Sequence, residues 1–375
     1  MLIGIDAHSL EKNRTGVGRV LFNLVKVWSA DYRLPTTARF VLYFKDEIPA
    51  DMPKAQNFEF KLLGVKSTAK FIHWDLARAA KKDKVDVLFC PGYVAPICYK
   101  GKIALTLHDI IYEAHPEWFH WQSWADKILL KWVSKKSAQK ASVIFACSEH
   151  TKREIKKYFK VPDEKIVVAE LAVDEELKNA DSNANETQIK RLGILNKFAF
   201  FAGSIFDRRH LPEVIGAFSR LAEEKQDLQF LISGKDNTDK KNIDSLIDSA
   251  NEDLKRKAIL RVDFVGDSDL KLMYGACAFF IYLSDYEGFG LPPLEAMSLG
   301  APVITSDLTS LKEVAGNAVL LVKNNSDEEE IYQAMKRMAE DNILREDLIR
   351  KGYEQEKKFS WEKCAKIVLE AMIKA

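Results

Sequence analysis

The chain has 375 residues, 47% hydrophobic and 30% charged, the composition of a folded protein with room for two domains. Its 56 basic and 55 acidic side chains leave a net charge of +1, so bulk electrostatics predict no nucleic-acid partner. The five cysteines are scattered and odd in number, which fits reduced core residues and not a disulfide framework. The chain begins directly in a strand pattern, and no apolar run is long enough to span a bilayer. We therefore expect a cytoplasmic protein whose membrane contact, if any, is peripheral.

Short apolar runs alternate with helical patterns along the first half of the chain. This alternation predicts an α/β fold, with a parallel sheet and helices on both of its faces. The expected strands are 2–6, 39–44, 58–63, 85–89, 103–107, 143–146 and 166–169. The clearest helical patterns are 17–29, 70–82 and 123–139.

A polar connector, 174–197, follows, and the alternation then restarts. Two α/β patterns joined by a polar connector predict two lobes with a cleft between them. In the second lobe the expected strands are 198–202, 228–233, 260–265, 278–283, 302–305 and 318–322. The expected helices are 211–224, 241–254, 269–274, 293–299 and 327–340, with a further short helix opened by a capping box at 310–313. The amphipathic segment 361–375 lies beyond the second sheet, and either lobe could receive it.

The most informative stretch is 285–307. It follows a buried-strand pattern, places Gly288 and Gly290 in a loop, and continues into a helix that begins near two prolines. A strand, a glycine loop and a helix N-terminus together offer backbone N–H groups to an anion. Glu287 and Glu295 flank the loop, and because carboxylates repel phosphate they indicate a ligand that also carries hydroxyls, such as a nucleotide-sugar. Taken singly, Glu295 could be a first-turn acid that complements the helix dipole, and Glu287 a loop residue.

Two positions in the first half are candidates for a ligand site. Gly16 and Gly18 lie after the first strand, at the start of a helix, but lack the third glycine and the distant acid of a dinucleotide fingerprint. A plain strand-to-helix turn and a phosphate loop therefore both stay open. His108 follows the strand 103–107 at its carboxyl end, where open α/β sheets bind ligands. Asp109 either orients its imidazole or caps the next turn.

Two charged pairs in the second half have competing interpretations. Arg208 and Arg209 follow the first strand of the second lobe and form either a solvated turn or a cationic site for a departing phosphate. Asp267 and Asp269 match the Asp-x-Asp pattern of metal sites. Their place before a helical pattern fits better with Ser268 or Asp267 as an N-cap and with a first-turn acid, so we expect no metal.

Residues 124–160 are strongly basic, with ten Lys or Arg against three acids. An apolar stripe accompanies the charge and comprises Trp121, Trp124, Ile128, Leu129, Trp132 and Val133. A basic amphipathic helix with tryptophan can lie on an anionic membrane, which would suit a lipid-linked acceptor. The alternative is a solvated basic face with the tryptophan stripe in the core.

With these motifs the chain resembles the retaining glycosyltransferases of family 4, which have the GT-B fold of two Rossmann-like, doubly wound domains facing across a cleft. The resemblance is dense from residue 201 to about 361 and includes the family's two glutamates separated by seven residues, Glu287 and Glu295. It is thinner in the first half, where it covers 5–7, 15–19 and 107–109. The most similar type is the bacterial mannosyl- or rhamnosyltransferase of surface polysaccharide synthesis.

The resemblance implies domains at 1–180 and 190–360, with 361–375 packing back on the first. It also implies retaining, metal-independent transfer of a mannose-type hexose from a nucleoside-diphosphate sugar to a glycan or lipid-linked acceptor, without a cofactor. The alternatives are a GT-B epimerase or phosphorylase, and a non-catalytic nucleotide-sugar-binding subunit of a polysaccharide complex.

The resemblance assigns roles residue by residue. The implied catalytic residues are His108 near the transferred sugar, Glu287 accepting from sugar hydroxyls, and Arg208 and Arg209 on the donor diphosphate. The family usually has a lysine beside the arginine, so Arg209 keeps the charge with altered geometry. Glu295 is expected to accept from ribose hydroxyls, and the backbone of residues 265–266 to seat the base. The implied donor-binding residues are Gly16, Gly18, Val265, Gly266, Gly288, Phe289, Gly290, Leu291 and Glu295.

Overall fold

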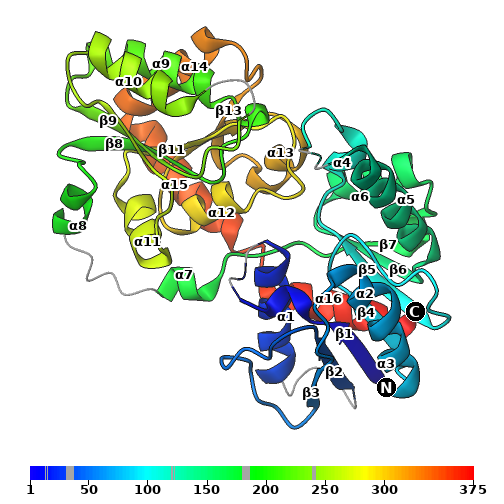
Figure 1. The fold of residues 1–375 in the computed structure, drawn as a ribbon. Helices are drawn as coiled ribbons and strands as arrows, with labels where there is room; N and C mark the ends of the chain where they lie inside the picture. The colour runs from blue at the N-terminus through cyan, green and yellow to red at the C-terminus, as the bar shows by residue number, and fades with distance from the viewer. Residues whose placement is uncertain are drawn as a thin grey trace. The chain divides into compact units, whose positions relative to one another are not determined.

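The structure is a computed structural model that describes residues 1–12, 14, 16–30, 38–119, 121, 123–179, 186–238 and 242–375 (Figure 1). The chain divides into two compact units: unit 1 is Met1–Leu171 with Ser360–Ala375, and unit 2 is Ala172–Phe359. Unit 2 begins earlier than the predicted boundary because α7 (Glu175–Asn179) packs against α11 (Asp267–Ala276) and Leu177 is buried. The rest of the predicted connector includes residues 180–185, which lie outside the described residues.

Within the described residues, unit 1 contains a seven-stranded parallel sheet in the order β3-β2-β1-β4-β5-β6-β7. The strands are β1 (Leu2–Asp6), β2 (Arg39–Phe44), β3 (Phe58–Leu62), β4 (Val87–Cys90), β5 (Lys102–Leu107), β6 (Val143–Ala146) and β7 (Ile166–Val168). β4 and β6 are short apolar runs that are buried along their whole length, as expected when helices cover both faces of a parallel sheet. The strand order reverses between β1 and β4, and an open sheet binds ligands at the carboxyl ends of strands near such a point.

The helices of unit 1 include one that arrives from the far end of the chain. Its helical elements are η1 (His8–Leu10), α1 (Val17–Ala30), α2 (Thr68–Lys70), η2 (Phe71–Leu76), α3 (Ala77–Lys82), α4 (Ile111–Ala114), α5 (Trp124–Lys140), α6 (Glu149–Phe159), η3 (Asp163–Lys165) and α16 (Trp361–Lys374). α16 packs against α1 and β6, and the Trp28 indole donates a hydrogen bond of 3.1 Å to the Ala365 carbonyl (Figure 1). The segment 361–375 therefore completes the core of unit 1.

Helix α5 begins where the pattern predicts but turns a different face inward. Ser123 caps it by accepting from the Asp126 N–H. Small and β-branched residues make its buried side, namely Val133, Ser134, Ser137 and Ala138. Four members of the predicted apolar stripe are exposed instead, namely Trp124, Ile128, Leu129 and Trp132. The interpretation that places the tryptophan stripe in the core is wrong for these residues.

The described part of unit 2 contains a six-stranded parallel sheet in the order β10-β9-β8-β11-β12-β13, the strand order of a doubly wound nucleotide-binding domain. The strands are β8 (Lys197–Ala202), β9 (Leu228–Ser233), β10 (Ile259–Val262), β11 (Phe279–Tyr282), β12 (Val303–Ser306) and β13 (Val319–Val322). Aromatic rings fill the space beside the two central strands, with Phe201 stacked on Tyr282 at 5.7 Å between ring centroids. The order reverses between β8 and β11.

The helices of unit 2 correct two predicted caps. Besides α7 and α11 they are α8 (Glu186–Arg191), η4 (Asp207–Arg209), α9 (Leu211–Glu224), α10 (Ile243–Asp253), α12 (Leu291–Ser298), α13 (Thr309–Ala315), α14 (Glu328–Glu340) and α15 (Asn342–Glu356). Gly266, not Asp267 or Ser268, is the N-cap of α11, with both aspartates in the first turn. The predicted capping box is also wrong, because the Ser310 hydroxyl donates to the Glu287 carbonyl at 2.7 Å instead of capping α13. α10 begins after the N-cap Asn242, and residue 241 of its predicted span lies outside the described residues.

Candidate functional site

The loop between β11 and α12 has the geometry that its glycines predict. Gly290 is the N-cap of α12 and has a φ of +111°, in the left-handed region that favours glycine. A Cβ at this position would also lie 2.9 Å from the Leu311 side chain. Two prolines occupy the first turn of α12, where a missing N–H costs no intrahelical hydrogen bond. The backbone of 288–291 is thereby fixed at the start of a helix, with its N–H groups at the positive end of the helix dipole.

Glu287 is paired with Arg209 at the start of this loop. The Arg209 Nε and Nη2 atoms lie 3.1 and 3.0 Å from Glu287 Oε1, and the Tyr282 hydroxyl donates to the same oxygen at 3.1 Å. Burial would raise the pKa of the Glu287 carboxyl, but the positive charges of Arg209 and Arg208 outweigh it and hold this pKa below the usual value. Glu287 is therefore an anion at neutral pH. Burial acts against the Arg209 charge in the same way, and the Glu287 carboxylate raises the pKa of Arg209.

Arg208 and Arg209 both join the turn after β8 to the loop after β11. The Arg208 Nε donates to the Tyr286 carbonyl at 3.2 Å, and its guanidinium lies 4.4 Å from the centre of the Phe206 ring. The Arg209 guanidinium also donates to the Ser204 carbonyl. The solvated-turn interpretation does not describe Arg209, whose side chain is only 10% exposed. The structure thus brings Glu287, Arg208, Arg209 and the 288–291 backbone together.

A second set of polar residues, which the sequence analysis did not identify, holds this loop in place by hydrogen bonds. His210 donates through Nε2 to Asp285 Oδ2 at 2.6 Å, and Asn325 donates to Asp285 Oδ1 at 2.8 Å. Ser306 donates to Asn325 at 2.8 Å, and its oxygen accepts from the Ser284 N–H at 2.9 Å. These contacts join residues up to 75 positions apart, so no local pattern predicts them. The sequence shows only that His210 follows the arginine pair and that Asp285 precedes Glu287.

Glu295 lies in α12 with its side chain turned inward. It is 7% exposed, and the Tyr274 hydroxyl of α11 donates to its Oε2 at 3.3 Å. Glu295 is the fifth residue of α12, whose first turn contains no acidic residue, so the alternative of a first-turn acid that complements the helix dipole does not fit. Val265 and Gly266 lie after β10, at the start of α11. A Cβ at Gly266 would meet nothing within 4 Å, so the backbone there is open.

In unit 1 the two predicted glycines differ. Gly16 has a φ of +45° and open space where a Cβ would be. At Gly18 a Cβ would lie 2.2 Å from the Ser9 carbonyl, so this glycine permits close packing of α1 on η1. Gly16 thus has the geometry of an open loop, and Gly18 the geometry of a packing position. Residue 15 of the same motif lies outside the described residues.

His108 lies at the carboxyl end of β5, as its position in the sequence predicts. Its Nε2 donates to the Pro91 carbonyl at 3.0 Å, which leaves Nδ1 as the unprotonated nitrogen of a neutral ring. Burial lowers the pKa of His108 to about 4, against the opposite effect of this hydrogen bond. Asp109 accepts from the Ile111 N–H and from the Tyr93 hydroxyl, both at 3.1 Å. These contacts give Asp109 the capping role of the two that the sequence left open.

The structure also pairs His8 with Asp6, which the sequence analysis did not identify. Asp6 ends β1, and its Oδ1 accepts from His8 Nδ1 at 2.6 Å. Burial would lower the pKa of His8, but the Asp6 carboxylate outweighs it and the pKa is raised. A histidine two residues after a strand aspartate is too common a pattern to have been selected without the structure.

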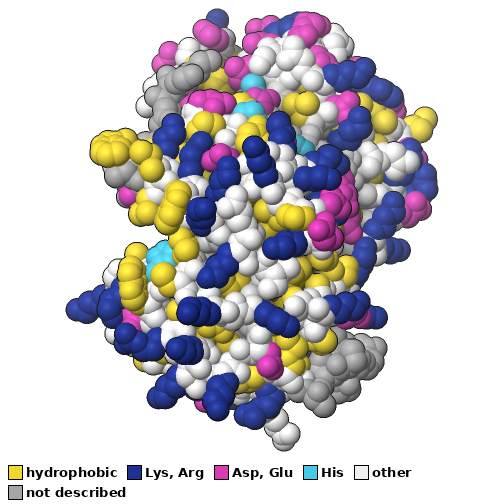
Figure 2. Space-filling view, turned by 90° about the vertical axis from the view of Figure 1, so that its right-hand side faces the viewer, with side chains coloured by type: hydrophobic (Ala, Val, Ile, Leu, Met, Phe, Trp, Pro, Cys, Tyr) yellow, Lys and Arg dark blue, Asp and Glu magenta, His cyan; other side chains and the backbone are white. Residues whose placement is uncertain are grey.

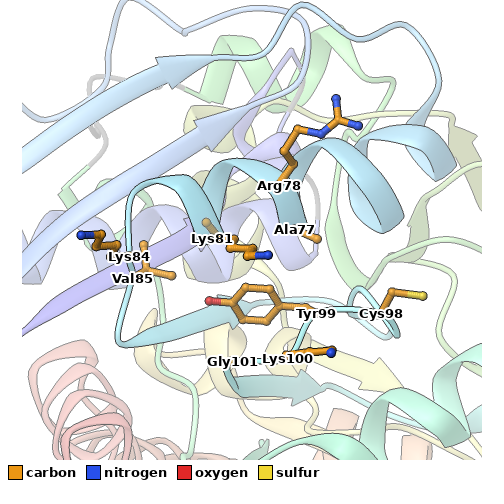
Figure 3. Close-up of a pocket in the computed structure, with 10 residues that line it drawn as sticks. Ala77, Arg78, Lys81, Lys84, Val85, Cys98, Tyr99, Lys100 and Gly101 are labelled. Atoms are coloured by element: carbon orange, nitrogen blue, oxygen red, sulfur yellow. The ribbon is translucent and has the colours of Figure 1, made fainter.

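Two cavities lie away from all of these residues. One in unit 1 has a volume of about 540 Å³ and lies at the amino ends of β4 and β5; in Figure 3 the Tyr99 ring lies between Lys81 and Lys100. Another in unit 2, of about 550 Å³, lies at the amino ends of β8, β9 and β11. Both are at the edge of their sheet opposite the carboxyl ends, so neither contains a predicted site residue. Among the described residues, no group of three or more His, Cys, Asp or Glu side chains is arranged to hold a metal ion. In the same part of the chain no helix is long and apolar enough to cross a membrane.

Comparisons with known proteins cover both units. The model of the family "Glycosyltransferase Family 4" matches residues 15–177, and that of "Glycosyl transferases group 1" matches 185–355. O-antigen chain mannosyltransferase B of Escherichia coli is 28% identical over 93% of each chain. The serotype-specific mannosyltransferase WbdA of Escherichia coli is 30% identical over 62% of this chain, which corresponds to 29% of WbdA.

Solved structures agree in fold. Anabaena HepE in complex with UDP-glucose superposes over 100% of this chain and 99% of its own, with a TM-score of 0.73 at 15% identity. WaaG, a glycosyltransferase involved in lipopolysaccharide biosynthesis, gives a TM-score of 0.71 at 13% identity over 100% of this chain and 99% of its own. With two doubly wound units, and with a glycosyltransferase family matching each of them, the chain belongs to the family 4 glycosyltransferases of the GT-B fold.

Proposed function

We propose that this glycosyltransferase moves a mannose-type hexose from a nucleoside-diphosphate sugar to a hydroxyl of a glycan or lipid-linked acceptor, with retention of anomeric configuration and without a metal. The observation that carries the proposal is the buried Arg209–Glu287 pair at the glycine loop that opens α12. The mannosyltransferase relatives support the choice of sugar and a role in surface polysaccharide synthesis. The proposal includes a cytoplasmic location, with peripheral contact of residues 124–160 on the inner face of the membrane.

Unit 2 holds the donor in this proposal. The N–H groups of 288–291 receive the diphosphate, because they lie at the positive end of α12. Arg208 and Arg209 stabilise the negative charge that develops on the departing diphosphate, which is why no metal is required. Glu295, held by Tyr274, accepts from the ribose hydroxyls, and the open backbone at 265–266 receives the base.

Glu287 binds the transferred sugar and is not a nucleophile in this proposal. Arg209 and Tyr282 contact its Oε1, and we assign Oε2 to the sugar hydroxyls. A carboxylate that is paired with a buried guanidinium is a weak nucleophile, since attack would break the pair in a site of low dielectric. Retention then follows from attack on the face that the diphosphate leaves, with a diphosphate oxygen taking the proton of the acceptor hydroxyl.

Unit 1 holds the acceptor side. The pKa of His108 is about 4, so its ring is neutral at physiological pH. Its Nε2–H donates to the Pro91 carbonyl, and its Nδ1 can therefore accept a hydrogen bond from a hydroxyl. We assign it to positioning the transferred sugar and the acceptor. We assign Gly16, whose turn is open, to phosphate binding, while Gly18 supports that turn by close packing.

The first test is nucleotide binding followed by transfer. A saturating diphosphate nucleotide, at about 100 times its dissociation constant, should stabilise the protein by about 2.7 kcal/mol, which a thermal-shift panel of GDP, UDP and dTDP detects. Glu287→Ala and Arg209→Ala should each lower the rate of transfer by about 100-fold or more, since each leaves a buried charge unpaired. The anomeric configuration of the product, read by proton NMR in the presence of EDTA, tests retention and metal independence together.

Arg220→Ala is the matched control, because it removes an exposed arginine of unit 2 that pairs with Glu329 at 2.8 Å. Its transfer rate should stay within about twofold of the parent, as expected for a surface ion pair. If no diphosphate nucleotide stabilises the protein, or if Glu287→Ala and Arg209→Ala behave like Arg220→Ala, the proposed site is wrong.

A further inference from the structure

The cavity in unit 1 is lined by cations that no carboxylate neutralises. Its lining contains no Asp or Glu but includes Arg78, Lys81, Lys84 and Lys100. All four side chains are exposed, and among the described residues none of them forms an ion pair. The volume of about 540 Å³ is within the range of sites that bind small molecules. We call it the cationic cavity.

The acids that lie close to these cations in the sequence are bound to other groups. Asp83 pairs with Lys61 at 2.8 Å and accepts from the Tyr43 hydroxyl at 2.8 Å. Asp86 accepts from the Leu2 N–H at 2.7 Å. Figure 2, which views the side of the molecule on which α3 lies, shows many Lys and Arg side chains and few acidic ones in its lower part. An anion at the cationic cavity is therefore attracted by more charges than repel it.

One wall of the cationic cavity is the ring of Tyr99. This residue is 6% exposed, and a Cβ at Gly101 would lie 2.6 Å from the ring, so the ring packs directly on the glycine backbone. Its hydroxyl forms no hydrogen bond with any described residue. Burial, with smaller effects of Cys90 and Asp86, raises the pKa of Tyr99. The hydroxyl therefore keeps its proton and can donate to a ligand in the cavity.

Two segments of the chain contribute the cations. Arg78 and Lys81 lie about one turn apart in α3, and Lys84 follows the end of this helix. Lys100 comes from the loop before β5, and in Figure 3 it lies on the other side of the Tyr99 ring from Lys81. Lysines at the end of a helix complement its dipole, which would explain Lys81 and Lys84 without a ligand. The dipole of α3 does not explain Lys100 or the Tyr99 hydroxyl.

The cavity of similar size in unit 2 has a different charge pattern. Its lining includes Lys225 and Glu340, which pair at 2.9 Å. Arg345 of the same lining donates to the carbonyls of Met338 and Ala339. That cavity therefore has charges of both signs that the protein itself pairs or satisfies, in contrast to the cationic cavity.

We propose that the cationic cavity binds a small phosphate ester with at least two negative charges. Its phosphate oxygens accept from the lysine ammonium groups and the arginine guanidinium, which form charge-assisted hydrogen bonds with such anions. The Tyr99 hydroxyl donates to the same ligand. The Tyr99 ring, with the buried side chains of Val85 and Ala80, covers the less polar part of the ligand. A neutral sugar does not require four cations, and a cationic ligand is repelled by them.

The cationic cavity is separate from the residues assigned to sugar transfer. It lies at the amino ends of β4 and β5, whereas open α/β sheets bind their substrates at the carboxyl ends. The same two strands lead from the cavity to Pro91 and His108, which are joined by the hydrogen bond of 3.0 Å described above. The phosphate ester is therefore neither the donor nor the acceptor of the transfer reaction. This site goes beyond the proposed function and does not rest on it.

Pyridoxal phosphate tests the site, because this aromatic phosphate ester also carries an aldehyde. The aldehyde condenses with a lysine amine to an imine, with loss of water, and borohydride reduces the imine to a stable amine that peptide mass spectrometry locates. At low ratios of probe to protein, the label should be found mainly on Lys81, Lys84 or Lys100. Fructose bisphosphate should lower this labelling by about fivefold or more, and fructose should not. The cations assigned to the donor diphosphate are arginines, which form no such imine, so the label distinguishes the two sites.

Two variants separate charge from shape. Lys81→Gln with Lys100→Gln should lower the affinity for pyridoxal phosphate, measured by calorimetry, by about tenfold or more. Gly101→Ala should also lower this affinity, without any change in charge, because the added methyl group displaces the Tyr99 ring. Tryptophan emission shows that unit 1 of each variant is folded.

Lys366→Gln is the matched control, because it removes a 63% exposed lysine of α16, also in unit 1, and should leave the affinity unchanged. Label spread evenly over the exposed lysines, or equal labelling by pyridoxal without its phosphate, would overturn the site. The same conclusion would follow if Lys81→Gln with Lys100→Gln folded and bound pyridoxal phosphate as tightly as the parent. Stabilisation by a diphosphate nucleotide tests the donor site separately, so the failure of one site leaves the other intact.

Discussion

Arg209 reaches Glu287 through space that a glycine at position 203 leaves open. Gly203 has a φ of +138°, and a Cβ there would lie 2.9 Å from Arg209 Nη1. Any other residue would therefore be strained in its backbone and would also displace the guanidinium. The ionised state of Glu287 depends in turn on that guanidinium, because burial alone would raise the carboxyl pKa. A side chain at position 203 would thus disturb one of the two cations that keep Glu287 ionised.

The lowered pKa of His108 predicts a pH dependence of stability. The pKa is about 4 in the fold and about 6.5 in the unfolded chain, so the unfolded state binds more protons between these values. Stability should therefore fall as the pH falls from about 6.5 toward 4. At pH 5 the loss due to His108 is about 1–2 kcal/mol.

His108→Gln isolates the contribution of His108 to the pH dependence of stability, because a glutamine amide can still donate to the Pro91 carbonyl but does not titrate. Urea unfolding at pH 7 and pH 5 should show a smaller loss of stability in His108→Gln than in the parent, by about 1–2 kcal/mol. Equal losses in the two proteins would mean that His108 titrates near its ordinary pKa.

At the scale of elements, two short connections are joined by side-chain hydrogen bonds and an ion pair. The turn that contains η4 and the loop that precedes α12 come from neighbouring strands, β8 and β11. Arg208, Arg209 and His210 of the turn all contact the loop, the first through a carbonyl and the other two through carboxylates. The position of Glu287 is therefore set by three contacts across the switch point of the sheet and not by the loop alone.

His210→Asn tests this coupling. His210 has a φ of +50°, a conformation that asparagine tolerates, but an asparagine side chain is too short to reach Asp285. We expect a loss of about 1–2 kcal/mol in the free energy of unfolding and about a tenfold fall in the transfer rate, with weaker nucleotide binding. Asp347→Ala, which removes an exposed acid of α15, should change none of these three quantities. An unchanged transfer rate in His210→Asn would show that the turn and the loop are independent.

The sequence predicted the elements better than it predicted their surroundings. Buried runs such as 143–146 and 279–282 carry apolar or aromatic side chains on both faces, so their place in a parallel sheet could be predicted from residue type alone. Strand β10 ends at Val262, earlier than the pattern suggested, because the pattern of apolar residues continues past the last paired residue. Helix α15 was missed, since its apolar residues are few and its exposed side is rich in charge.

The residues of the site differ in the same way: those with a local sequence signal were predicted, and those whose contacts depend on the strand order were not. Glu287, Gly290 and the arginine pair were found because a strand tip, a glycine loop and cations have local signals. Asp285 with His210 and the Ser310 contact to Glu287 were not found, because each depends on which strands lie side by side. The local pattern at Ser310 even favoured the wrong partner, since a capping box and a contact to another loop use the same hydroxyl.

At the scale of the whole molecule, the chain passes between its units twice, after Leu171 and after Phe359. The core of unit 1 consequently depends on α16, whose Leu369 is 1% exposed. Leu369→Ala should lower the stability of unit 1 by about 2–5 kcal/mol, the usual cost of such a cavity in a core. Ile373→Ala, on the 44% exposed side of the same helix, is the control and should cost much less.

The seven tryptophans make this measurable, because every one of them belongs to unit 1: Trp28, Trp74, Trp118, Trp121, Trp124, Trp132 and Trp361. Tryptophan emission therefore reports the unfolding of unit 1, and stabilisation by a nucleotide reports unit 2. In Leu369→Ala the emission transition should move to lower urea, with the nucleotide effect retained. A transition that does not move would show that α16 adds little to unit 1.

The return of α16 has a consequence for the order in which the protein is made. A ribosome releases residues in sequence, and domains usually fold in that order, the first one first. Here the first 171 residues emerge without the helix that covers α1 and β6, while unit 2 is complete once residue 359 has emerged. The unit that is begun first is thus finished last, and until then its apolar surface is available to chaperones. Substitutions in α16 should therefore lower the yield of newly made protein more than they lower the activity of the molecules that do fold.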